Sequence, residues 1–137
     1  MGRLIVGRIF QGLAWLVVAG LVIEFYLAGA ALFGVTTFQP HRLLGVVLAV
    51  AIMLLLVLSL VARPWQRVTG MAALLAALTI VQVSLPRLQT VVPSIAALHV
   101  INAALLLGLA GPIARSAGRL PAPSSSPEAL APVGSRT

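Results

Sequence analysis

The chain has 137 residues, of which 61% are hydrophobic and 8% charged, and it contains no cysteine. This composition predicts a single integral membrane domain and excludes an ordinary globular core. The absence of cysteine excludes a disulfide framework, a zinc cluster, an iron–sulfur site and thioether-linked haem. The net charge of +7 comes from arginines that flank apolar segments, which favours a membrane over nucleic acid as the partner.

Four apolar runs are long enough to cross a bilayer, which takes roughly 20 residues. We predict transmembrane helices over about residues 9–33, 43–62, 68–85 and 94–113, with prolines at or beside their ends. Because the loops are short, the predicted fold is all-α, an up-down four-helix bundle over residues 1–115. Residues 116–137 are rich in Pro, Ser and Ala and are predicted to be a disordered tail.

The placement of the nine arginines predicts the orientation of the bundle. Arg42 and Arg87 fall on one side, and the other seven fall on the side of the termini. The positive-inside rule then places both termini and the tail in the cytoplasm. A signal peptide cleaved near residues 28–30 is an alternative, but the apolar run is long for a signal core and Glu24 interrupts it.

Polar side chains are rare in the predicted helices and gather in their outer half. They are Glu24 on the first helix, His41 at the mouth of the second, Gln82 on the third, and His99 and Asn102 on the fourth. Because a polar group inside a membrane is costly, these residues form the candidate site.

His41 and His99 are the only histidines in the chain. Their helices are diagonal neighbours in an up-down bundle, about 11–14 Å apart. Two axial imidazoles on one haem iron need roughly 12–13 Å between their backbones, so the bundle permits a shared haem. Gly45 and Ala103, each one turn from a histidine, either leave a slot for a flat ring or simply permit close helix packing.

The remaining charged residues of this region each have two interpretations. Arg42 and Arg87 either hold haem propionates or anchor the helices at the interface. Glu24 either relays protons or binds a cation, or it is a neutral acid hydrogen-bonded to Gln82 or a histidine. The hydroxyl groups of Ser59, Thr79 and Ser84 are expected to bond backbone carbonyls and not to act as nucleophiles.

Several of these segments resemble a known family. The segment of residues 40–45, Pro-His-Arg-Leu-Leu-Gly, resembles the His-Arg segment of the heme A synthase family. Residues 81–85, Val-Gln-Val-Ser-Leu, are similar to that family's third helix, and Pro93, Leu98, His99 and Ala103 are similar to its fourth. Over residues 10–113 the chain resembles one four-helix half of such an enzyme, and also small uncharacterised four-helix bacterial membrane proteins with the same histidines.

The resemblance implies axial haem ligation by His41 and His99. The family has a glutamate where this chain has Phe38, and it uses two half-bundles where this chain has one. The resemblance therefore implies a b-type cytochrome-like protein with haem b, which transfers electrons because two imidazoles leave the iron no open position.

Three functions stay open from the sequence. The first is this haem-binding electron carrier, and the second is a non-catalytic accessory subunit of a larger membrane complex or homo-oligomer in contact with lipids. The third is a small proton-coupled transporter that uses Glu24, since small multidrug transporters also have four helices and one glutamate in the first. The chain has no phosphate loop, dinucleotide fingerprint or nucleophile elbow, which argues against a soluble enzyme.

Overall fold

The computed structural model describes residues 2–62 and 66–117, and within these ranges it contains helices and no strand. Its four long helices are α1 (Gly2–Leu32), α2 (Gln39–Ala62), α3 (Gln66–Ser84) and α5 (Leu98–Ala117). A short 3₁₀ helix, η1 (Leu85–Leu88), and a single helical turn, α4 (Pro93–Ala96), connect α3 to α5. Each long helix contains a window that is long and apolar enough to cross a membrane. Within the described residues, the predicted all-α architecture is confirmed, with four helices long and apolar enough to cross a membrane.

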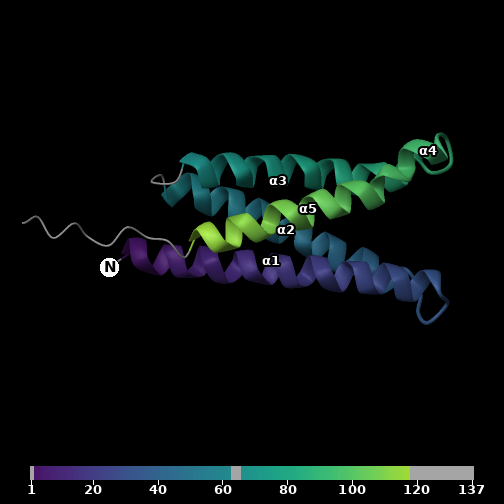
Figure 1. The fold of residues 1–137 in the computed structure, drawn as a ribbon, viewed down its shortest axis with the longest axis horizontal. Helices are drawn as coiled ribbons and strands as arrows, with labels where there is room; N and C mark the ends of the chain where they lie inside the picture. The colour runs from purple at the N-terminus through teal and green to yellow at the C-terminus, as the bar shows by residue number, and fades with distance from the viewer. Residues whose placement is uncertain (1, 63–65, 118–137) are drawn as a thin grey trace, which may run out of the picture.

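The four long helices run alternately up and down (Figure 1). Helix α1 packs against α2 and α5, and α3 packs against the same two helices, so α2 and α5 face each other across the diagonal. The α1–α2 loop, η1 and α4 lie at one end of the bundle, and the two ends of the described chain lie at the other (Figure 1).

The observed helix boundaries differ from the prediction in several places. Helix α1 begins at Gly2, seven residues before the predicted start at Ile9. Helix α2 begins at Gln39, four residues before the predicted start at Leu43, so His41 lies inside its first turn. The fourth span is interrupted between Ala96 and Leu98. Pro112 lies inside α5 and not at its end, because membrane helices tolerate a proline whose freed backbone groups are satisfied locally. Helix α5 continues to Ala117, and the rest of the predicted tail lies outside the described residues.

A glycine ends α1 and turns the chain toward α2. Gly34 has a φ of +73°, a left-handed conformation that a residue without Cβ adopts at little cost. The Gly34 N–H donates to the Ala31 carbonyl at 3.1 Å, and the Val35 N–H donates to the Ala30 carbonyl at 2.8 Å. This is the Schellman pattern, which satisfies carbonyls that the end of a helix leaves free.

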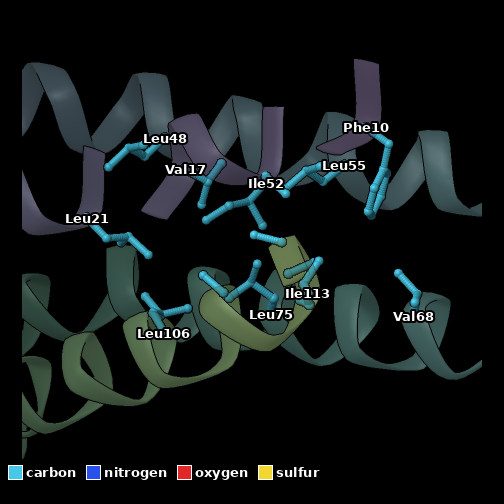
Figure 2. Packing of buried hydrophobic residues seen from close by; sticks show 14 residues of the cluster. Phe10, Val17, Leu21, Leu48, Ile52, Leu55, Val68, Leu75, Leu106 and Ile113 are labelled. Carbon is cyan, nitrogen blue, oxygen red and sulfur yellow. The ribbon is translucent and has the colours of Figure 1, made fainter. Parts of the chain in front are cut away.

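An apolar core fills the middle of the bundle and draws on all four long helices (Figure 2). Its largest buried members include Phe10 and Val17 of α1, Ile52 and Leu55 of α2, Leu75 of α3 and Ile113 of α5. The outer surface is apolar as well, since Leu16, Val50 and Ile101 are each at least 60% exposed. A surface of this kind matches lipid tails, which cover apolar side chains without cost.

Gly20 marks a close approach between α1 and α2. A Cβ at this position would lie 2.5 Å from Cδ2 of Leu48, a core side chain that is itself only 7% exposed. We expect Gly20→Ala to lower the free energy of unfolding in detergent by about 1–3 kcal/mol, the usual cost of overpacking. Gly12→Ala is the matched control, because nothing lies within 4 Å of a Cβ there. Equal stability of the two variants would contradict the close packing of α1 on α2.

Candidate functional site

Five polar side chains form one layer of the bundle, which we call the polar layer: Glu24, His41, Gln82, His99 and Asn102. Each long helix contributes to it. Glu24 and Asn102 are buried, at 9% and 6% exposure, and the other three are half-buried. The layer follows the apolar core along the bundle, toward the end that carries the α1–α2 loop, because Glu24 lies near the end of α1 and His41 near the start of α2.

Helices α1 and α2 supply an acid–imidazole pair. Oε2 of Glu24 pairs with Nδ1 of His41. Its second oxygen, Oε1, has no hydrogen-bond donor among the described residues. Gly45 lies beside that oxygen, since a Cβ on Gly45 would be 3.5 Å from it. A Cβ at Gly45 would therefore be in ordinary van der Waals contact with the Glu24 carboxyl group. Of the two partners that the sequence offered for a neutral Glu24, Gln82 or a histidine, the observed partner is a histidine.

Helices α3 and α5 supply a hydrogen-bonded network around His99. Nδ1 of His99 lies 3.0 Å from the Gln82 carbonyl, and Nε2 lies 3.2 Å from the side-chain nitrogen of the same glutamine. The Asn102 amide donates to the Gln82 side-chain oxygen at 2.7 Å and to the Leu78 carbonyl at 2.9 Å. Every polar atom of a buried network needs such a partner, because water cannot supply one inside a membrane.

The two histidine rings meet across the diagonal of the bundle. The centroids of the His41 and His99 rings are 6.2 Å apart, with an angle of 79° between the ring planes. The ring of Phe38 packs edge-on against His41 on another side, at 6.3 Å and 76°. Apart from this contact between the rings, the polar interactions of the layer join α1 to α2 and α3 to α5, and among the described residues none of them links one helix pair to the other.

The other predicted site residues take no part in the polar layer's hydrogen bonds or ion pairs within the described part of the chain. Arg42 and Arg87 are exposed, and the Arg87 guanidinium donates to the Val83 carbonyl one turn earlier. Ala103 is half-buried on α5, in the turn that follows His99. Residues 2–62 and 66–117 contain no cluster of three acidic, histidine or cysteine side chains that could hold a metal ion.

The predicted hydrogen bonds of the serine and threonine hydroxyl groups to backbone carbonyls are confirmed. Ser59 donates to the Leu56 carbonyl at 2.7 Å, Thr79 to the Leu75 carbonyl at 2.8 Å, and Ser84 to the Ile80 carbonyl at 2.8 Å. Each of these hydroxyl groups donates to a backbone carbonyl of its own helix.

Sequence reasoning did not foresee two roles in the layer. Gln82 contacts His99 through both its backbone and its side chain, and Phe38 covers the His41 ring. An amide in an apolar helix signals a polar contact in general, but its partner depends on how α3 and α5 are rotated against each other. Phe38 precedes the predicted helix, so the sequence did not indicate that its ring packs against His41.

Comparison with known proteins adds one similarity. Residues 24–90, just under half of the chain, match a family described as "Family of unknown function (DUF6220)". The matched segment contains Glu24, His41 and Gln82 and ends before His99. No curated protein matches the chain. No solved structure matches it either.

Proposed function

We propose that the chain is a small b-type cytochrome-like protein of a bacterial inner membrane, which binds haem b through His41 and His99 and transfers electrons. The observation that carries the proposal is the 6.2 Å separation of the two ring centroids across the diagonal of the bundle. A metal–imidazole bond is about 2 Å long, so two imidazoles on one metal place their ring centres roughly 6 Å apart. A porphyrin supplies four further nitrogen ligands, and the protein then needs no third side chain.

The polar partners of the two rings support the same assignment. A metal-binding histidine usually engages one ring nitrogen with a carboxylate or a backbone carbonyl, which fixes the orientation of the ring and leaves the other nitrogen to the metal. Glu24 is the carboxylate partner of His41, and the Gln82 backbone carbonyl is the partner of His99. In both rings the engaged nitrogen is Nδ1, which leaves Nε2 as the ligand. At His99, the side chain of Gln82 must first move away from Nε2.

Bound haem supplies a one-electron carrier, and two imidazole ligands leave it no open position for oxygen chemistry. The chain's own residues hold the ligands and exclude water from them. Glu24 orients His41, Gln82 orients His99, and the aliphatic core closes the layer on one side. Arg42 and Arg87 are the cations nearest in sequence to this end of the bundle, and we assign them to the propionates. Gly45 and Ala103 put little or no side chain on the helix faces one turn from each histidine.

The orientation and the tail belong to the same proposal. Seven of the nine arginines lie on the side of the two termini, which supports a cytoplasmic location for both termini and a position of the polar layer near the outer face of the membrane. Residues 116–137 then extend into the cytoplasm.

An absorption spectrum of the full chain tests the proposal. We expect protein purified in mild detergent from haem-replete cells to show a Soret band and, on reduction, sharp and separate α and β bands. Conversion of the haem to its pyridine complex should identify it as haem b. Purified chain that takes up no haem under these conditions contradicts the proposal. Such chain, if it is recovered in a stable complex with other membrane proteins, favours the accessory-subunit function.

A further inference from the structure

We propose that Gln82 is a placeholder for the metal at His99: in the haem-free chain its side-chain amide occupies Nε2 of His99, and it leaves when haem binds. This inference rests on the function proposed above. It concerns the haem-free site. Its evidence is which atom donates and which accepts in each hydrogen bond between α3 and α5.

The order of that network is fixed at its first end by a backbone carbonyl. The Leu78 carbonyl can only accept, so the Asn102 atom 2.9 Å from it is the amide nitrogen. That nitrogen has a second hydrogen, which is donated to the Gln82 side-chain atom 2.7 Å away. This atom is therefore the Gln82 oxygen, and the Gln82 amide nitrogen must face His99.

The rest of the order follows from the same rule. The Gln82 amide nitrogen can only donate, so Nε2 of His99 accepts from it at 3.2 Å and carries no hydrogen. The hydrogen of the neutral ring is then on Nδ1, which lies 3.0 Å from the Gln82 carbonyl, a second obligatory acceptor. A backbone carbonyl thus lies at each end of the network, and both carbonyls require the same tautomer of His99, with hydrogen on Nδ1.

This tautomer is the one that a metal requires. A histidine that binds iron through Nε2 needs its hydrogen on Nδ1 and a lone pair on Nε2. In a membrane that lone pair would otherwise be a half-buried acceptor without a partner. The Gln82 side chain satisfies it at the cost of one hydrogen bond that the arriving haem must break. The Gln82 carbonyl, being backbone, keeps hold of Nδ1 after the side chain has left.

The placeholder predicts a gain of haem affinity on mutation, whereas a purely structural role predicts a loss. We expect Gln82→Leu to bind haem roughly two- to tenfold more tightly than the wild type, because a neutral hydrogen bond of modest net strength no longer competes. Haem titration of the full chain in detergent measures this change. Gln89→Leu is the matched control, since Gln89 is exposed and its side chain is outside the network.

Nitrogen NMR of the haem-free, histidine-labelled chain gives a readout that needs no haem. We expect His99 to show hydrogen on Nδ1 alone in the wild type, and its Nε2 resonance to shift in Gln82→Leu. Gln82→Glu keeps the size of the side chain but offers only acceptors when ionised, so Nε2 should gain a hydrogen while Nδ1 keeps the one that faces the backbone carbonyl of residue 82.

The outcomes separate the two proposals. Hydrogen on Nε2 in the wild type overturns the placeholder, and so does an unchanged or weaker haem affinity in Gln82→Leu. A wild-type chain that forms no bis-histidine haem complex overturns the proposed function instead, whatever the NMR shows. Gln82→Glu provides the tautomer measurement if Gln82→Leu fails to fold.

Discussion

Replacing either histidine with alanine should abolish the bis-histidine haem spectrum. Loss of a residue that merely supports a metal ligand already costs about 10–100-fold in affinity, so loss of a ligand itself should cost more than about 100-fold. We expect His99→Ala and His41→Ala to lose the sharp, separate α and β bands, and any haem that is retained should have an open coordination position. The reduced spectrum and the haem content per chain measure both effects.

Val100→Ala and Leu43→Ala are the controls for this experiment. Both side chains are 65% exposed, and each lies within two positions of a histidine in the sequence. They should keep the wild-type spectrum. An unchanged spectrum in His99→Ala or His41→Ala would exclude that residue as a ligand, whatever the control variants do.

Phe10→Ala should be among the most destabilising single substitutions in the core. The side chain is fully buried near the start of α1, in the half of the bundle away from the polar layer. In lipid the hydrophobic transfer term is small, because an apolar side chain is as well solvated by lipid tails as by protein. The cavity alone should cost about 2 kcal/mol for a void of about 100 Å³. Reversible unfolding in mixed micelles measures this difference.

Phe33→Ala removes the same atoms from a side chain that is 83% exposed, just past the end of α1. It should change the free energy of unfolding by less than about 0.5 kcal/mol. If the two phenylalanine substitutions cost the same, the core is not packed as Figure 2 shows it.

The helices were predictable because a membrane constrains them by length and composition alone. An apolar run of bilayer thickness has to be a helix, and short loops place successive helices side by side. Their boundaries were less predictable. The polar residues at the start of α2 do not mark a helix start by their hydropathy, although proline, here Pro40, is common in the first turn of a helix. Pro112 suggested a helix end, but the hydrogen bond from Ser116 to its carbonyl shows α5 continuing past it.

The membership of the polar layer was predictable, but the pairing within it was not. Depth along each helix follows from a constant rise per residue, so all five polar residues could be placed in one half of the bundle. Which of them touch depends on how each helix is rotated about its own axis. In uniformly apolar helices the sequence barely encodes that rotation. The early start of α2 also brought His41 down beside Glu24, a pairing that the later predicted start obscured.

The closure of polar pairs within α1–α2 and within α3–α5 has a consequence for biosynthesis. A nascent chain enters the bilayer from its N-terminus, and the first two segments can bury Glu24 against His41 before the third is made. The last two segments can do the same for Gln82, His99 and Asn102. Each hairpin then leaves the translocon with most polar groups of the layer already paired, and the union of the two hairpins depends mainly on the fit of aliphatic surfaces.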